Sequence, residues 1–191
     1  MDKELSSLLD YILSFREVGK RFSFGSYQGC QILWRVLEVA DYSLLVISEN
    51  ILMTKPFDSK RMSKNWKVCT LNKWLNNEFY NEAFTAGEKN FIEDTPQGKI
   101  FLLTTKEIEK YFPERLNRLC LPIPYAKSSE VDYSSEDYDP GSDYSLWWLS
   151  RTPNKYPCFR TVEAVDNEGR FTDISVDFPY CGIRPVLRLK T

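Results

Sequence analysis

Tyr144-Ser145-Leu146-Trp147-Trp148-Leu149-Ser150-Arg151 is the stretch that decides the fold, together with Cys181-Gly182-Ile183-Arg184-Pro185-Val186-Leu187-Arg188-Leu189 near the carboxyl end. Two adjacent tryptophans are costly to expose to water. Because successive side chains of an extended segment point to opposite faces, one indole is expected in the core and the other at a surface or groove. The outward indole is the first candidate for a binding contact.

The size and composition indicate a globular protein with an ordinary core. The chain has 191 residues, of which 42% are apolar and 27% are charged. These values are typical of folded water-soluble domains and not of disordered or membrane proteins. No apolar run is long enough to span a bilayer, and the first residues lack the order of a secretion signal. We therefore expect a cytoplasmic protein that does not contact membranes.

Histidine is absent, and this excludes many catalytic classes. Ser-His and Cys-His nucleophiles, His general bases and most catalytic zinc sites all need this residue. The five cysteines form no C-x-x-C pair and are odd in number, so reduced, buried thiols are the expectation. No cofactor and no catalytic residue is predicted.

Charge is distributed unevenly along the chain. The net charge is −2, yet residues 130–143 carry six acids and no basic residue, which leaves 21 acids against 25 bases elsewhere. The net charge of −2 disfavours nonspecific binding of nucleic acid, so no nucleic-acid partner is predicted. Three aspartates of this acidic stretch raise the alternative of a calcium site, but their spacing differs from that of a helix-loop-helix site, so no metal is assigned: Asp137, Asp139 and Asp143. A basic loop over 55–67 raises a phosphate alternative, but it lacks a glycine-rich turn.

The opening residues predict an amphipathic helix over 1–20, followed by a single domain over 21–191. Apolar residues recur on one helical face, at Leu5, Leu8, Leu9, Ile12 and Leu13. This stripe is expected either to pack on the rest of the chain or to form a homodimer.

The remainder alternates between strand and helix patterns. We expect strands over 22–25, 32–39, 44–47, 99–103, 162–165, 170–174 and 183–189, and a helix over 70–83. Thr85 and Thr104 each stand three residues before a glutamate, which is the spacing of a capping box. Gly169 is expected to take a positive φ in the turn of the last hairpin.

These motifs resemble an uncharacterised bacterial domain family. That family has a W-R-V-L strand, an L-x-x-W-L-N helix, a W-W-L-R-S-P segment and a terminal G-V-R-P-A-L strand. Here the corresponding residues are 34–37, 71–76, 147–153 and 182–187. The third segment departs from the family pattern, because the arginine is displaced by one residue, to Arg151.

The family is distantly similar to the C-type-lectin-like fold in its formylglycine-generating-enzyme-like version. The resemblance implies an α+β domain in which two or three helices flank one twisted antiparallel sheet, with paired first and last strands. Ligand contacts would lie in an irregular region over 151–180. Cys158 and Cys181 do not match the copper-binding cysteine pair of the catalytic members, and the sugar-binding triplets of calcium-dependent lectins are missing, so neither activity is carried over.

Three functions remain as hypotheses. The first is a noncatalytic module that binds a protein or glycan through an aromatic and arginine surface within 144–181, at Trp147, Trp148, Arg151, Asn154, Tyr156, Arg160 and Tyr180. The second is an enzyme acting on glycans through carboxylates such as Glu163, Asp173 or Asp177. The third is a structural or oligomerisation role for the amino-terminal helix.

Overall fold

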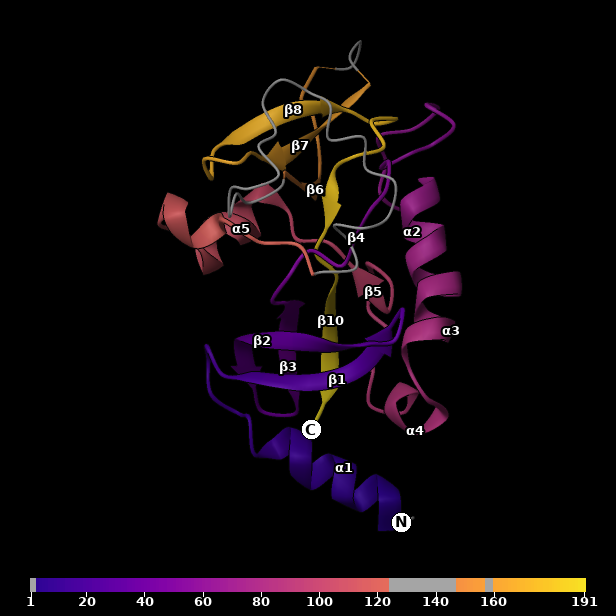
Figure 1. Ribbon diagram of the computed structural model, residues 1–191, viewed down its shortest axis with the longest axis vertical. Coiled ribbons are helices and arrows are strands. Elements are labelled where there is room, and N and C mark those ends of the chain that lie inside the picture. Colours follow the sequence, from indigo (N-terminus) through magenta and orange to yellow (C-terminus); the bar gives the residue numbers. More distant parts are fainter. Residues whose placement is uncertain (1–2, 124–146, 157–159) are drawn as a thin grey trace. The chain divides into compact units, whose positions relative to one another are not determined.

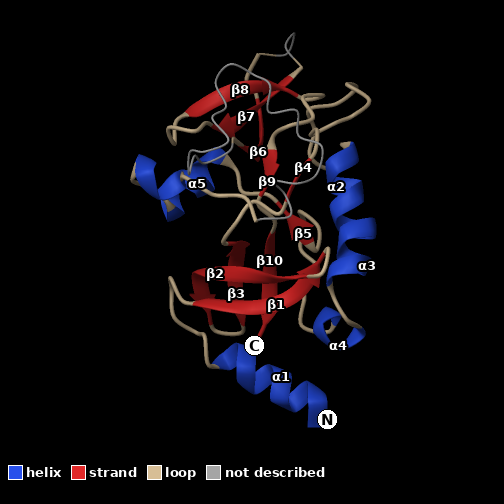
Figure 2. Ribbon diagram, in the orientation of Figure 1, coloured by secondary structure: helices blue, strands red, loops and turns tan. Residues whose placement is uncertain are grey.

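The computed structural model describes residues 3–123, 147–156 and 160–191 (Figure 1). The protein is a mixed α+β structure with two five-stranded sheets and a few short helices (Figure 2). The chain divides into two compact units. The first comprises Met1–Glu49, Asn72–Leu102 and Pro185–Thr191, and the second comprises Asn50–Leu71 and Leu103–Arg184. The proposed division into a helix over 1–20 and one domain over 21–191 stays a prediction.

The sheet of the first unit is built on a meander. β1 (Arg21–Tyr27), β2 (Cys30–Ala40) and β3 (Ser43–Ser48) follow each other with short connections, and β10 (Val186–Lys190) and β5 (Ile100–Phe101) complete the order β1-β2-β3-β10-β5. All pairs are antiparallel. The predicted pairing of first and last strands is wrong. The tight β1–β2–β3 connections place β2 beside β1, so β10 adds to the free edge of β3.

Apolar side chains on both faces hold this sheet together. Four consecutive residues of β3, Leu44 to Ile47, are buried, as expected for a strand covered on two sides. Trp34 of β2 is fully buried and donates its indole N–H to the carbonyl oxygen of Phe24 at 2.6 Å. Burial of apolar side chains therefore stabilises these strands over most of their length.

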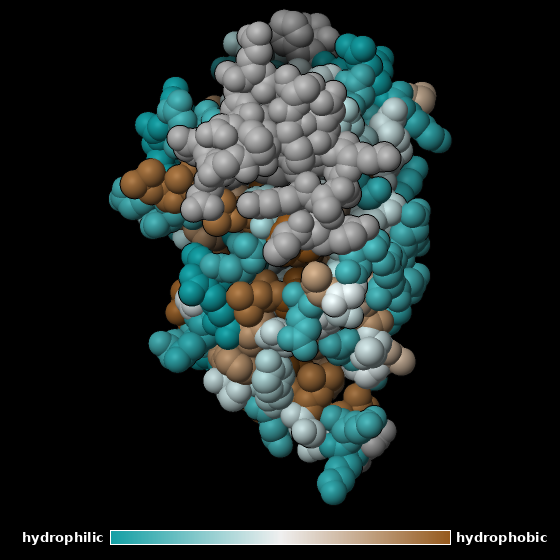
Figure 3. All heavy atoms as spheres, viewed as in Figure 1, coloured by the Kyte–Doolittle hydropathy of each residue, from teal (hydrophilic) through white to brown (hydrophobic). Residues whose placement is uncertain are grey.

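The helix predicted over 70–83 is present and contains a π turn. It consists of α2 (Thr70–Trp74), the π segment η1 (Leu75–Phe79) and α3 (Tyr80–Ala83). Within the π turn, the Asn76 side chain accepts hydrogen bonds from the backbone N–H groups of Lys99 and Ile100 and donates one to the Ile100 carbonyl. Asn76 thereby holds the short strand β5. Hydrophilic residues cover the visible side of this helix (Figure 3).

α1 (Lys3–Leu13) packs in part on its own unit. Ile12 is buried, Leu5, Leu8 and Leu9 are half-buried, and Leu13 stays 37% exposed. α4 (Ala86–Lys89) contacts α1, and the predicted capping box at Thr85 and Glu88 is confirmed. Packing on the parent chain therefore covers part of the apolar stripe, while the homodimer stays a prediction.

The second unit holds the other sheet, in the order β4-β9-β6-β7-β8. Its strands are β4 (Met53–Thr54), β9 (Gly182–Ile183), β6 (Trp148–Pro153), β7 (Thr161–Val165) and β8 (Phe171–Ser175). β6 and β9 run parallel and the other pairs are antiparallel. The expected β7–β8 hairpin is confirmed, with Gly169 at a φ of +76°. A Cβ atom on Gly169 would lie only 2.1 Å from the Arg115 carbonyl oxygen.

Two expectations about sheets are therefore corrected. The described residues form two sheets instead of one, and the strand expected over 183–189 is divided. Gly182 and Ile183 form β9 in one sheet, whereas residues 186–190 form β10 in the other. Pro185 lies at the break because it has no N–H for a ladder, although its carbonyl oxygen accepts from the Ser48 N–H at 2.9 Å.

The helical and thiol features of the second unit complete the fold. α5 (Thr105–Tyr111) starts at the predicted capping box of Thr104 and Glu107, and the 3-10 turn η2 (Arg115–Arg118) follows it. Among the described cysteines, Cys69, Cys120 and Cys181 are buried free thiols and Cys30 is partly exposed. Cys158 lies outside the described residues. No helix in the described part of the chain has the length and apolar character needed to cross a bilayer.

Candidate functional site

The paired indoles occupy opposite environments. Trp148 opens β6 with only 1% of its surface exposed, whereas Trp147 is 37% exposed. The Trp148 Nε1 donates to the Arg118 carbonyl oxygen at 2.9 Å, and the Arg184 guanidinium carbon lies 4.8 Å from the Trp148 ring centre. The expected inside and outside placement of the two rings is confirmed. Trp148 is consequently a core residue, and Trp147 is the ring available to a ligand.

Three exposed aromatic residues form what we call the aromatic edge: Trp147, Phe178 and Tyr180. Phe178 and Tyr180 are 40% and 41% exposed, and their ring centres lie 5.7 Å apart in an edge-to-face arrangement. The Gly182 N–H donates to the Trp147 carbonyl oxygen at 2.6 Å, so the backbone that follows Tyr180 lies against Trp147. A Cβ on Gly182 would approach that oxygen to 2.8 Å, which requires glycine here.

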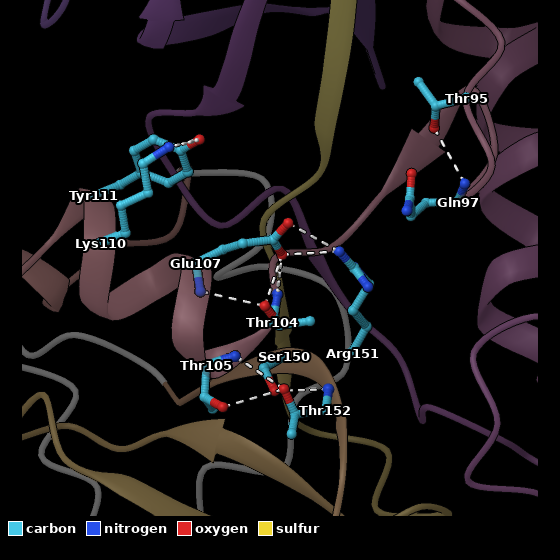
Figure 4. A network of polar contacts seen from close by, with 10 residues as sticks. All are labelled: Thr95, Gln97, Thr104, Thr105, Glu107, Lys110, Tyr111, Ser150, Arg151 and Thr152. Carbon is cyan, nitrogen blue, oxygen red and sulfur yellow. Dashed lines mark hydrogen bonds and ion pairs between the residues drawn. The ribbon is translucent and has the colours of Figure 1, made fainter.

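Arg151 is committed to a structural ion pair (Figure 4). Its Nη2 lies 3.0 Å and 2.8 Å from the two carboxylate oxygens of Glu107. Glu107 also accepts from the backbone N–H and the hydroxyl of Thr104, so one carboxylate serves both the helix cap and the ion pair. The Arg151 backbone N–H donates to the Leu103 carbonyl. Arg151 therefore links the start of α5 to β6.

Asn154 is likewise structural, and it positions Tyr156. The Asn154 side chain is buried, donates to the Asp173 carboxylate and accepts from the Tyr156 N–H at 2.7 Å. The Lys64 Nζ donates to the carbonyl oxygens of Asn154 and Tyr156 at 2.7 Å and 2.6 Å. These contacts hold the loop after β6, and half of the Tyr156 surface stays exposed.

Arg160 meets the basic loop that follows β4. Its Nη1 donates to the Arg61 carbonyl oxygen, and the Arg61 guanidinium lies 3.6 Å from the Asp177 carboxylate. A hydrogen bond from the Ser175 hydroxyl lowers the pKa of Asp177, with a smaller contribution from Arg61. A carboxyl with a lowered pKa is poorly suited to act as a general acid at neutral pH.

The other two carboxylates of the enzyme hypothesis face each other across the hairpin. Glu163 on β7 is the direct register partner of Asp173 on β8. Asp173 accepts a hydrogen bond from the Asn154 side chain. In the described ranges, no group of three or more Cys, Asp or Glu side chains is arranged to hold a metal ion. The calcium alternative at Asp137, Asp139 and Asp143 lies outside the described residues.

Asp58 organises the basic loop from inside. Only 2% of this residue is exposed, and its carboxylate accepts from the backbone N–H groups of Met62, Ser63 and Thr70. Burial alone would raise the pKa of Asp58, but these bonds and one from the Thr70 hydroxyl together hold it below its usual value. The loop is thus fixed around a buried negative charge.

The structure sorts the predicted contact residues into two groups. Trp148, Arg151 and Asn154 are buried or paired within the fold, whereas Trp147, Tyr156, Arg160 and Tyr180 are exposed. Sequence reasoning missed Phe178 and Arg61 as neighbours of this surface. Phe178 lies close to Tyr180 in sequence and could have been found, but Arg61 is distant along the chain and carries no such signal.

Comparison with known proteins gives one match. The profile of DUF6273, a domain of unknown function, matches residues 41–191, so α1, β1 and β2 lie outside the matched region. No curated protein and no solved structure shows a significant match to the chain. Because the matched region covers most of the sequence, the chain belongs to the DUF6273 family.

Proposed function

We propose that this protein is a noncatalytic binding module that contacts a protein or glycan through the aromatic edge and the adjacent Tyr156 and Arg160. The observation that carries the proposal is the contrast between the two adjacent indoles. Trp148 is buried and hydrogen-bonded, while Trp147 leaves 37% of a large apolar side chain in contact with water. Aromatic side chains supply large contact area at low cost in conformational entropy.

Backbone hydrogen bonds at Trp147 and Tyr156 support the same function. Trp147 is held by the bond from Gly182, and Tyr156 is held by Asn154 and Lys64. A surface that is already ordered before binding loses less freedom when a ligand arrives. Exposed rings on a fixed backbone can stack on the face of a sugar or accept an apolar side chain of a protein.

The C-type-lectin-like similarity belongs to this proposal as its finer form. The irregular region expected over 151–180 includes Tyr156, Arg160 and Phe178, which are exposed. The separation of β1 from β10 in the first sheet argues against a close match to that fold. The binding proposal rests on the exposed residues and does not require the lectin-like assignment.

The test compares Trp147 with another exposed aromatic residue, Tyr42. Trp147→Ala should leave the unfolding midpoint nearly unchanged and weaken ligand binding by about tenfold, since one anchor ring is worth roughly 1–2 kcal/mol. Tyr42→Ala is a matched control, because Tyr42 is 80% exposed in the other unit. Ligands are found with an oligosaccharide array and a panel of purified proteins, and affinities are measured by tryptophan fluorescence.

Two results would contradict the proposal. One is a Trp147→Ala protein that fails to fold, because Trp147 would then be a core residue. The other is a ligand whose affinity is the same for Trp147→Ala and for Tyr42→Ala.

A further inference from the structure

The second unit carries a group of cations that the aromatic edge does not explain. We call it the cation cluster: Lys60, Arg61, Lys64, Lys67, Lys155 and Arg160. Five of them are exposed, and Lys64 is half-buried with its ammonium on the carbonyl oxygens of Asn154 and Tyr156. Arg160 contacts the Arg61 carbonyl, so two chain segments distant in sequence contribute to one cluster.

The carboxylates near the cluster leave part of its charge uncompensated. Asp58 is buried and accepts backbone N–H groups, Asp177 pairs with Arg61, and Asp173 accepts a hydrogen bond from the Asn154 side chain. The segments 58–70, 154–156, 160, 173 and 176–177 hold six basic residues and three acidic ones. Removing these from the totals of 25 and 27 leaves 19 basic and 24 acidic residues in the rest of the chain, with six of those acids in residues 130–143. The excess of positive charge is thus local.

The loop presents these cations in a fixed geometry. Arg61 has a φ of +52°, a conformation that side-chain-bearing residues adopt rarely and at a cost of about 1 kcal/mol. Hydrogen bonds from the Arg61, Met62 and Ser63 N–H groups to Asp58 maintain this turn. The Asp58 N–H in turn donates to the Val176 carbonyl at 2.7 Å, and the Val176 N–H donates to the Arg160 carbonyl at 3.0 Å. Asp58 and Val176 thereby link Arg61 to Arg160.

The cation cluster adjoins the aromatic edge. Asp177, which pairs with Arg61, directly precedes Phe178 in the chain. In Figure 1 the loop between β4 and α2 extends to the level of β8, the strand that ends at Ser175. The residue that pairs with Arg61 is therefore the chain neighbour of Phe178, one ring of the aromatic edge.

We propose that the partner is a short acidic segment of another protein, in which Glu or Asp side chains alternate with aromatic or apolar ones. This inference rests on the proposed function and names the chemistry of its ligand. Planar guanidinium groups such as those of Arg61 and Arg160 bind carboxylates in a bidentate manner. A long polyanion fits less well, because the excess of positive charge is confined to the cluster.

The experiment uses the full chain and a fluorescein-labelled peptide rich in Glu and Tyr, with a peptide carrying Gln in place of Glu as the uncharged counterpart. Binding is followed by fluorescence anisotropy. The acidic peptide should bind and the Gln peptide should bind at least about tenfold more weakly, and raising salt from about 0.05 M to about 0.5 M should reduce this difference.

Variants locate the interaction. Arg61→Gln with Arg160→Gln should weaken binding of the acidic peptide by about tenfold. Lys73→Gln with Lys106→Gln removes the same charge at two exposed helical positions that do not belong to the cluster and should change binding by less than about twofold. Arg61→Lys with Arg160→Lys should give an intermediate loss, because lysine keeps the charge and loses the bidentate geometry.

Three results would overturn the inference. The acidic peptide does not bind, or the Lys73→Gln, Lys106→Gln protein loses as much affinity as the Arg61→Gln, Arg160→Gln protein, or a single-stranded oligonucleotide binds more tightly than the peptide. Trp147→Ala is measured in parallel to separate the two proposals. If it leaves peptide affinity unchanged while the Arg variant loses it, the cation cluster stands and the aromatic edge is rejected for this ligand. The reverse pattern rejects the cation cluster and keeps the aromatic edge.

Discussion

The two units bury different kinds of side chain. Among the described residues, the buried polar or charged side chains of the first unit comprise Ser48 alone, whereas those of the second unit are Asp58, Thr105, Arg118, Ser150, Asn154 and Arg184. The first sheet also has the longer strands, with β2 reaching 11 residues. We infer that the first unit is stabilised mainly by apolar burial, and that the second depends on hydrogen bonds to buried polar groups.

This difference explains where the exposed candidate residues lie. The short strands of the second unit leave long connections between them, and polar contacts hold these connections in place. Arg118 illustrates the principle, since its guanidinium donates to the carbonyl oxygens of Phe112, Pro113 and Gly169 and lies over the Phe171 ring. Residues next to the strand ends, among them Trp147, Tyr156 and Arg160, can then be held at the surface.

The largest expected effect comes from Asp58→Asn. The amide nitrogen would face the N–H groups of Met62 or Ser63 where the carboxylate now accepts them. We expect a loss of about 3 kcal/mol in the free energy of unfolding, measured by urea denaturation at neutral pH. Asp41→Asn is the exposed control in the first unit and should cost less than about 0.5 kcal/mol. Equal losses of unfolding free energy in Asp58→Asn and Asp41→Asn would contradict the inference that buried polar groups stabilise the second unit.

The same substitution should change the response to acid. Because the pKa of Asp58 is lowered in the folded state, its carboxylate stabilises the fold at pH values above the unfolded pKa, near 4. This contribution is lost as the pH falls through the lower, folded pKa. The stability difference between wild type and Asp58→Asn should therefore narrow below about pH 4. A constant difference over that range would contradict the assigned role.

The buried tryptophans offer a matched pair, one in each unit. Trp34 and Trp148 both donate their indole N–H to a backbone carbonyl, but only Trp148 also lies near the Arg184 guanidinium. Phe substitution should cost about 2–3 kcal/mol for Trp34 and about 1 kcal/mol more for Trp148, measured by chemical denaturation. A larger loss for Trp34→Phe would show that apolar packing outweighs the polar contacts of the second unit.

The two capping boxes allow a comparison of the units through smaller losses of stability. Thr85→Ala removes a cap at α4 and should cost about 0.5–1 kcal/mol. Thr104→Ala should cost about 1–2 kcal/mol, because Glu107 also holds Arg151 and would lose one of its own partners. Thermal unfolding of both variants gives the ranking. Equal losses would mean that the link from α5 to β6 adds no stability.

The smallest effect on stability is expected at Leu13 of α1, where Leu13→Ser should cost less than about 0.5 kcal/mol because the side chain is 37% exposed. The substitution tests whether the first unit has a role besides stability. If the α1 stripe forms a homodimer, the variant and a chain beginning at Lys20 should both sediment at lower mass than the full chain. Identical masses would reject the dimer.

Local patterns predicted much of the secondary structure. The period of apolar residues placed the strands β1, β2 and β3 and the helix over 70–83, and the Thr-x-x-Glu spacings placed the caps at Thr85 and Thr104. Gly169 was correctly assigned a positive φ. These features depend on neighbours within a few residues, so the sequence contains the information needed. The lectin-like assignment and the binding role stay predictions.

Long-range features were predicted poorly. The division of 183–189 between two sheets and the pairing of β10 with β3 depend on which strand edges are free after the meander forms. The part of Arg151 in binding stays a prediction, and its ion pair could not be predicted for a similar reason. Its partner Glu107 lies 44 residues away, and an exposed arginine and a paired one have the same local sequence.

By itself, the sequence determined the local elements, the absence of histidine chemistry and the outward position of one of the two adjacent indoles. Only the tertiary structure decided that Trp148 and Asn154 are buried and that Arg151 is paired with Glu107. It also decided which side chains are exposed: Trp147, Phe178, Arg61 and Arg160. The physical reason is that helix and strand formation follow from local periodicity, whereas the exposure and pairing of a polar or aromatic side chain depend on residues that only folding brings to it.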